Sequence, residues 1–231
     1  MHPQVAHLLK LNEGLPPQRT DGWYAMRKNS LTASAVASAL GMNPYESANK
    51  LITVKCGQGT FTGNAATEHG NKYEDEARIL YENMYNEKVH EVGLLPHPTQ
   101  DFLAGSPDGV TESGRLVEIK CPLKRDIGDG DVPGHYMPQL QLLMDIMDLE
   151  VCDFIQYKPE SITWPAPREF VVVTVERERE WFEGNLPIMR NFWDRVLWHR
   201  EHGTEGLIRK RKTPSTTTPK RPAPPPPPCE V

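Results

Sequence analysis

The stretch LAGSPDGVTESGRLVEIKCP, residues 103–122, contains two turn signals, SPDG at 106–109 and TESG at 111–114. The second one predicts a β-hairpin over residues 103–121, centred on Ser113. Residues that face each other across this hairpin have numbers adding up to 226, so Asp108 lies opposite Glu118 and Ser106 lies opposite Lys120. A bulge at Gly114 is the alternative and would shift the register by one residue.

The alternation of side chains along a strand puts Glu118 and Lys120 on one face, with Val117 and Ile119 on the other. Two converging carboxylates beside a lysine suit a hard divalent cation such as Mg²⁺, which prefers oxygen ligands. The cation would activate water and neutralise a phosphate, and the ammonium group would orient the water. The alternative is a salt bridge from Glu118 to Lys120 or Asp108 on a solvated strand. The run around them is otherwise apolar, as in a strand inside a sheet, where charges need a reason.

Outward from the hairpin, the pattern predicts one α/β domain with a central sheet. The first 90 residues are typical of helices, with starts at Thr20 or Asp21 and at Thr32, and further helical segments at 46–57 and 64–86. Strands are expected at 89–95, 102–106, 115–121, 152–158 and 169–175. A helix is expected at 135–147, with Pro138 in its first turn. A last amphipathic helix begins near 176 and has an expected apolar face of Trp181, Phe182, Leu186, Ile188, Met189, Phe192, Trp193, Val196 and Leu197, with a kink at Pro187.

Charge divides the 231 residues into a body, 1–203, and a basic, proline-rich tail, 204–231. The net charge is −5. The tail has six basic residues against two acidic ones, a net charge of +4, which leaves −9 for the body. The tail cannot bury a core and is expected to be disordered or polyproline-like. An acidic body binds DNA only through a local patch or bound cations.

The sequence also excludes several classes of protein. It has no apolar run of membrane-spanning length, and its first residues lack the layout of a signal peptide. The four cysteines are scattered without a Cys-x-x-Cys pair, which argues against a zinc ribbon, an iron–sulfur cluster or a disulfide framework. Free thiols in a reducing compartment are expected instead.

Five blocks, in this order and spacing, resemble the phage lambda exonuclease (YqaJ-type viral recombinase) family within the restriction-endonuclease-like nucleases. The Pro-Asp…Glu-x-Lys pattern alone is weak, but the blocks together span much of residues 20–158. They are RKNSLTASAVASALG (27–41), HGNKYEDEA (69–77), AGSPDG (104–109), EIKCP (118–122) and YMPQLQLLM (136–144). The resemblance implies a restriction-endonuclease-like core, with a central mixed β-sheet flanked by helices.

The resemblance also implies roles for single residues. Asp108, Glu118 and the backbone carbonyl of Ile119 would bind metal, and Lys120 would activate the attacking water. Glu74 matches a helical glutamate beside the metals; its alternative is one more charge on a solvated helix. Gln139 matches a glutamine near the scissile phosphate; otherwise it is a polar residue in a first helical turn.

A second group of residues would hold a terminal 5′-phosphate. Arg27 and Ser34 have the seven-residue spacing of an arginine and a serine that do so in the family, and Ser106 would also reach the phosphate. The alternatives are a surface cation for Arg27, a small helix-packing residue for Ser34 and the first turn residue for Ser106. Arg125 aligns with a family arginine only with a one-residue gap.

The resemblance implies a Mg²⁺-dependent exodeoxyribonuclease, with two metal ions for which Mn²⁺ can substitute. It would degrade one strand of linear double-stranded DNA from 5′ to 3′ and leave a 3′ overhang for recombination. Implied partners are DNA ends, two further copies in a homotrimer and a single-strand annealing protein. The expected place is the cytoplasm of a phage's host, or the nucleus for a eukaryotic virus. Alternatives are a same-fold nuclease of other polarity or endonucleolytic action, and a non-catalytic DNA-end-binding protein.

Overall fold

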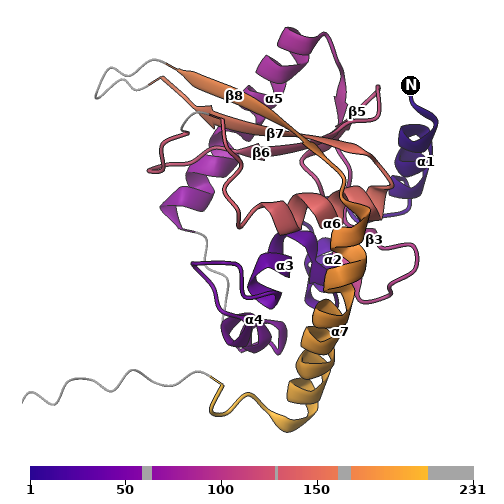
Figure 1. Cartoon of the computed structure of the whole chain (residues 1–231), viewed down its shortest axis with the longest axis vertical. Coiled ribbons are helices and arrows are strands. Elements are labelled where there is room, and N and C mark those ends of the chain that lie inside the picture. Colours follow the sequence, from indigo (N-terminus) through magenta and orange to yellow (C-terminus); the bar gives the residue numbers. More distant parts are fainter. Residues whose placement is uncertain (59–63, 128–129, 161–167, 208–231) are drawn as a thin grey trace, which may run out of the picture.

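The computed structural model describes residues 1–58, 64–127, 130–160 and 168–207 (Figure 1). Its helices are α1 (Pro3–Asn12), α2 (Asp21–Lys28), α3 (Ala33–Ala39), α4 (Ala48–Lys55), α5 (Ala65–Tyr85), α6 (Met137–Met147) and α7 (Arg179–His202). Its strands are β1 (Leu31–Thr32), β2 (Val89–His90), β3 (Leu95–Pro96), β4 (Leu103–Gly105), β5 (Gly109–Thr111), β6 (Leu116–Lys120), β7 (Val151–Lys158) and β8 (Glu169–Glu176). No helix in these ranges is long and apolar enough to cross a membrane.

The strands form two sheets. The larger one has the order β2-β5-β6-β7-β8 and is mixed, because β6 and β7 are parallel and its other neighbours are antiparallel. The smaller one has the order β1-β4-β3, in which β1 and β4 are parallel. The α/β architecture was predicted, but the second sheet was not, because two-residue strands leave no periodic signal.

Helices cover both faces of the larger sheet (Figure 1). On one face, Ala77 and Tyr81 of α5 pack against Val117 and Ile119 of β6. On the other face lies α6, in which almost every side chain is buried. A helix that is apolar around most of its circumference belongs inside a protein, so α6 is the central helix of the fold.

The predicted hairpin register is confirmed. Gly109 pairs with Val117 and Val110 pairs with Leu116, as the sum of 226 requires. The expected extent of 103–121 was wrong, however, because residues 103–105 form β4 in the smaller sheet, so Ser106 does not pair with Lys120 in this hairpin. Gly114 has a φ of +95° in the connecting turn, and the register is kept. The first turn signal works differently: residues 106–109 bend at Asp108 and carry the chain from β4 in the smaller sheet to β5 in the larger one.

The predicted helix starts are confirmed by their caps. The side chains of Thr20, Ser47 and Asn64 accept hydrogen bonds from the first-turn N–H groups of α2, α4 and α5. Thr32 precedes α3 without such a bond. Pro138 lies in the first turn of α6, where its missing N–H costs nothing.

Two expectations were wrong in detail. The strand expected over 89–95 is divided, because β2 pairs in the larger sheet and β3 in the smaller one. The apolar face of α7 is narrower than expected: Met189, Phe192, Trp193 and Val196 are buried, whereas Ile188 and Leu197 are 52% and 44% exposed. Only one stripe of this long helix faces the body. The helix is continuous through Pro187.

Most of the predicted tail, from residue 208 on, lies outside the described residues. Its first residues contact the body: the Thr204 hydroxyl donates to Gln58, and the Asn49 amide donates to the carbonyl of Leu207 at 3.2 Å. The division into 1–203 and 204–231 stays a prediction.

Candidate active site

The structure brings Asp108 and Glu118 together at the end of the β5–β6 hairpin. Asp108 directly precedes β5, and its Oδ2 accepts a hydrogen bond from the backbone N–H of Ile119 at 2.6 Å. The N–H and C=O groups of one strand residue point to the same side. The carbonyl of Ile119 therefore points beyond the end of β5, toward Asp108.

Glu118 is buried between the sheet and α6, with 1% of the residue exposed. Its Oε1 accepts hydrogen bonds from Nζ of Lys120 and Nε2 of Gln139, each at 2.5 Å. Its Oε2 is buried and has no hydrogen-bond partner among the described residues. The salt bridge expected as the alternative therefore exists, but not on a solvated face, because α6 covers it.

The charged forms of the Asp108 and Glu118 carboxylates are disfavoured where they lie. Burial, and then the charge of Asp108, raise the pKa of Glu118 to about 8. Burial also raises the pKa of Asp108, more than the charge of Lys120 and the Ile119 N–H lower it. Burial alone would lower the pKa of Lys120, but the charges of Glu118 and Asp108 raise it above its ordinary value, so its ammonium group stays charged.

Glu74 reaches the same place from α5. With Asp108 and Ile119 it lines two adjoining hollows of about 190 and 280 Å³, and Lys120 lines the larger of them. Burial and then the charge of Asp108 raise the pKa of Glu74 to about 7. Glu74 therefore belongs electrostatically to this cluster and is more than a charge on a solvated helix.

The sequence did not single out two neighbours of this cluster. Arg19 has a φ of +66° and places Nη2 3.5 Å from Oε2 of Glu74. The Tyr136 ring lies 5.4 Å from Nζ of Lys120. Tyr136 could have been predicted to lie near the site, because it stands in the YMPQLQLLM block three residues before Gln139. Arg19 could not, because it lies before all five blocks.

The donor set fits a hard divalent cation. It consists of oxygen atoms only: the carboxylates of Asp108 and Glu118, the Ile119 carbonyl and, beside them, Glu74. Within the described ranges no group of three His, Cys, Asp or Glu side chains is arranged to hold a metal ion by itself. Mg²⁺ needs few protein ligands, however, and the unpartnered Oε2 of Glu118 is the kind of atom that a cation would satisfy.

The residues expected to hold a 5′-phosphate lie around the neighbouring, smaller sheet: Arg27 in α2, Ser34 in α3 and Ser106 directly after β4. Nη2 of Arg27 donates to Oγ of Ser34 at 3.0 Å. The parallel pairing of Thr32 with Ala104 brings the start of α3 beside the segment that contains Ser106. The Ser106 hydroxyl itself donates to the carbonyl of Val92 at 3.3 Å. Arg27 and Ser34 are therefore in contact, whereas Ser106 is bonded elsewhere.

Residues 22–150 match the family model of the YqaJ-like viral recombinase domain. The chain belongs to the YqaJ-like viral recombinase family. Membership in this family supports a nuclease role.

Two curated relatives of this YqaJ-like chain come from viruses. Protein R354 of Acanthamoeba polyphaga mimivirus is 36% identical over 159 residues, which cover 61% of this chain and 29% of the relative. Protein D345L of African swine fever virus (strain Badajoz 1971 Vero-adapted) is 30% identical over 168 residues, which cover 58% of this chain and 47% of the relative. The matched part therefore spans less than half of each relative.

Solved structures show the fold of this family member. The alkaline exonuclease LHK-Exo of Laribacter hongkongensis is 28% identical, with a TM-score of 0.68 over 79% of this chain and 95% of the other. A phage-related exonuclease of Haemophilus somnus 129PT is 16% identical, with a TM-score of 0.55 over 74% and 96% of the two chains. The predicted restriction-endonuclease-like fold is thereby confirmed.

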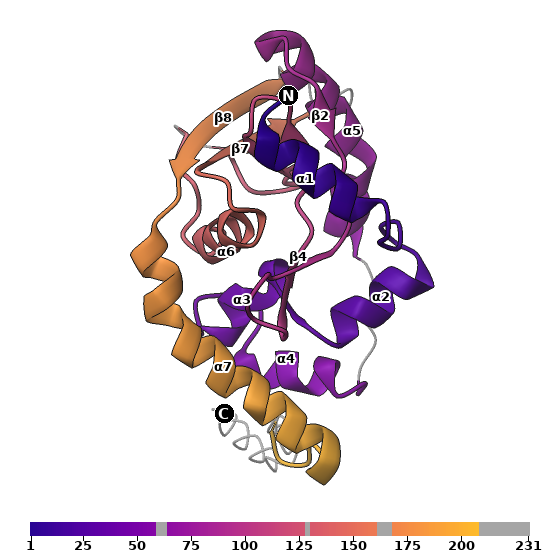
Figure 2. The ribbon, with the colours of Figure 1, turned by 90° about the vertical axis from the view of Figure 1, so that its right-hand side faces the viewer.

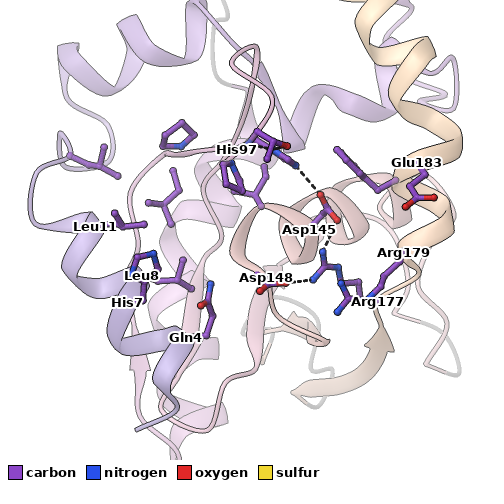
Figure 3. Close-up of a pocket in the computed structure, with 17 residues that line it drawn as sticks. Gln4, His7, Leu8, Leu11, His97, Asp145, Asp148, Arg177, Arg179 and Glu183 are labelled. Carbon is purple, nitrogen blue, oxygen red and sulfur yellow. Dashed lines mark hydrogen bonds and ion pairs between the residues drawn. The ribbon is translucent and has the colours of Figure 1, made fainter.

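The YqaJ-like chain has a larger cavity elsewhere, of about 850 Å³, between α1, the segment after β3 and the start of α7 (Figure 3). Four of its polar and charged groups, His97, Asp145, Asp148 and Arg177, pair with one another. Arg177 donates to Asp145 and Asp148 at 2.7 Å each, and the His97 ring lies 2.9 Å from Asp145. None of the predicted site residues lines it, so cavity size does not locate the candidate active site.

Proposed function

We propose that the chain is a divalent-metal-dependent exodeoxyribonuclease. It would hydrolyse one strand of linear double-stranded DNA stepwise from the 5′ end and leave a 3′ single strand for recombination by strand annealing. The observation that carries this proposal is the convergence of Asp108, Glu118 and Lys120. Asp108 and Lys120 line an open hollow, and Lys120 donates a hydrogen bond to Glu118, which is buried beside it. Family membership and the likeness to LHK-Exo support the same reaction class.

Asp108, Glu118 and the Ile119 carbonyl would hold the metal, with Glu74 beside them. A bound divalent cation, Mg²⁺ or Mn²⁺ and in our proposal a pair of ions, would offset the charge of the phosphate and make water more acidic. The protein sets the position of these ligands. The Ile119 N–H fixes Asp108, while Gln139 and Lys120 fix Glu118.

Lys120 would act as a cation and hydrogen-bond donor, because the neighbouring carboxylates keep its ammonium group protonated. An ammonium group has three N–H donors, and the salt bridge to Glu118 uses one. The others would orient the attacking water and stabilise charge on the phosphate. In this proposal Gln139 acts through Glu118, which it touches.

The 5′ polarity rests on Arg27. Its guanidinium group can bind a phosphate through two parallel hydrogen bonds, and Ser34 supplies a hydroxyl beside it. Ser106 would join them by exchanging its present bond to Val92. We further propose a homotrimer around DNA and a single-strand annealing partner, because these accompany the family's reaction.

The deciding experiment is digestion of a linear duplex labelled at one 5′ or one 3′ end, with Mg²⁺, Mn²⁺ or EDTA. The wild type should release label first from the 5′ end, only with metal. Asp108→Asn and Lys120→Met should each reduce the rate at least a hundredfold and still bind DNA. Lys88→Met, an exposed change beyond the far end of α5, is the matched control. Full activity of Lys120→Met would refute the mechanism, and release from the 3′ end would refute the polarity.

A further inference from the structure

Three helices end around a cluster of basic residues behind the Arg27–Ser34 pair. Lys55 is the last residue of α4, Arg200 lies in the last turn of α7, and Lys28 ends α2. Figure 2 shows α4 lying between α2 and α7. Lys55 is only 7% exposed, which is rare for a lysine and requires partners.

Those partners are backbone carbonyl groups at the end of α2. Nζ of Lys55 donates to the carbonyl of Arg27 at 2.5 Å and to that of Ser30 at 2.7 Å. Nη2 of Arg200 donates to the carbonyl of Lys28 at 2.5 Å. The last carbonyls of a helix have no partner within it, so the N–H donors of Lys55 and Arg200 satisfy this end of α2.

Arg200 also ties the two supporting helices to each other. Its guanidinium group donates to the carbonyl of Lys55 at 3.3 and 3.4 Å, and it lies 5.2 Å from the Trp193 ring. The ends of α2, α4 and α7 are thus joined through two side chains, neither of which lines the hollows at Asp108 and Glu74.

This arrangement holds Arg27 at both ends. Lys55 donates a hydrogen bond to the backbone carbonyl of Arg27. The guanidinium group of Arg27 lies 4.5 Å over the Trp23 ring and donates to Ser34. A shift of the end of α2 would therefore move the guanidinium group away from Ser34.

The surroundings are also unusually positive. Burial, and then the charges of Arg27 and Arg200, lower the pKa of Lys55 to about 7, and Glu46 opposes this only in part. Burial lowers the pKa of Arg27 as well. An anion arriving at Arg27 would relieve this repulsion, whereas a neutral group would not.

We propose that Lys55 and Arg200 are positioning residues that hold Arg27 for a terminal 5′-phosphate, and that they set the preference for phosphorylated over hydroxylated DNA ends. The proposal rests on the proposed function. It adds two residues, one from α4 and one from α7, to recognition of the DNA end.

The test compares hydrolysis of one linear duplex with either a 5′-phosphate or a 5′-hydroxyl end. In Lys55→Met and Arg200→Met, we expect the ratio of kcat/KM for the two ends to fall at least tenfold. The loss should appear in KM for the phosphorylated end, while the rate on the hydroxylated end stays unchanged. A purely structural role would lower both rates together.

Matched controls exist on the same two helices. Lys50→Met removes an exposed lysine of α4, and Arg195→Met removes an arginine of α7 that contacts Asn49; both should keep the wild-type ratio. Adding Lys55→Met to Arg27→Met should have no further effect on the ratio, since Lys55 acts through Arg27.

If the methionine variants do not fold, Lys55→Gln, which keeps an NH₂ donor group, and Arg200→Lys replace them. Each should show a smaller fall in the ratio. An unchanged ratio in folded variants would overturn this inference while leaving the nuclease proposal intact. A wild type that hydrolyses neither end with Mg²⁺ would overturn both.

Discussion

The backbone N–H of Ile119 and the carboxylate of Asp108 form a 2.6 Å hydrogen bond across the end of the β5–β6 hairpin. This bond continues the hairpin by one step, with a side chain in place of a backbone carbonyl. It fixes Asp108 next to Glu118, although burial and then the charge of Asp108 raise the pKa of Glu118. The hairpin thus keeps Asp108 and Glu118 close together although their proximity is electrostatically unfavourable.

Asp108→Asn should separate stability from function. Asparagine can keep the bond to Ile119 and removes the repulsion of Glu118, so its melting temperature in EDTA should equal or exceed that of the wild type. Saturating Mg²⁺, at a hundred times its Kd, should stabilise the wild type by about 2.7 kcal/mol and leave the variant unchanged. Calorimetry with and without Mg²⁺ checks this. An equal Mg²⁺-induced rise in the melting temperature of both proteins would show that Asp108 is not a metal ligand.

Gly109→Ala should displace the same carboxylate. A Cβ atom at this position would lie 2.2 Å from Cγ1 of Val89 and 3.2 Å from the carbonyl oxygen of His90, so β2 and β5 would have to separate. We expect a loss of about 1–3 kcal/mol in the free energy of unfolding and a larger relative loss of DNA hydrolysis. Val89→Ala should restore part of both. Gly184→Ala on α7, which meets nothing within 4 Å, is the control and should lose neither.

Lys55 should give stability a specific pH dependence. Its pKa is about 7 in the folded protein against 10.5 ordinarily, with Arg27, Arg200 and Glu46 as the charged groups around it. Between these values the unfolded chain binds more protons, so the wild type should gain stability relative to Lys55→Met as pH rises from 7 toward 10. Below pH 7, Lys55 is protonated in both the folded and the unfolded state. The difference in the free energy of unfolding between the wild type and Lys55→Met should therefore be constant there. Urea unfolding at several pH values tests this, and parallel curves above pH 7 would contradict it.

Arg115→Met should destabilise the fold without touching the candidate site. Nε and Nη2 of Arg115 donate to the buried Asp153 at 2.6 Å each, and Tyr81 and Thr174 donate to the same carboxylate at 2.5 and 2.8 Å. Removing the arginine leaves a buried charge without its counterion, at a cost of about 3–5 kcal/mol. Chemical denaturation at pH 7 measures this cost, and DNA hydrolysis per folded molecule should be unchanged.

The same pair predicts the effect of acid. Burial tends to raise the pKa of Asp153, but the bonds from Arg115, Tyr81 and Thr174 hold it below 3.8. The stabilisation is therefore present above that value and is lost as pH falls through the lower, folded pKa. The gap between wild type and Arg115→Met should narrow only in strong acid. If the difference in the free energy of unfolding vanished near pH 6, a group other than Asp153 would be responsible for it.

The hairpin was predictable because its information is local. Turn residues and the alternation of LVEIK set the register, and the register placed Asp108 opposite Glu118. The helix start at Thr20 was predictable for the same reason. The roles of the site residues were implied by the family resemblance and stay predictions.

Contacts between distant segments could not be predicted in the same way. Arg19 approaches Glu74 only because the fold brings α5 beside the segment before α2. Lys55 and Arg200 are 145 residues apart in the chain, and nothing in either local sequence indicates a shared partner. The crossing from one sheet to the other at Asp108 likewise joins two strands of only three residues each, β4 and β5, which are too short to show to which sheet each belongs.

The pairing of β1 with β4 has a consequence for the size of the product. It fixes the start of α3 beside the last residues before Asp108, and only Pro107 separates Ser106 from Asp108. Two residues of extended chain span at most about 7 Å, a length comparable to the spacing of neighbouring phosphates on one DNA strand. If Ser106 binds the terminal 5′-phosphate and Asp108 holds the metal at the scissile phosphate, the distance between these two residues sets a product of one nucleotide. Inserting a residue after Pro107 should then lengthen or abolish the released product.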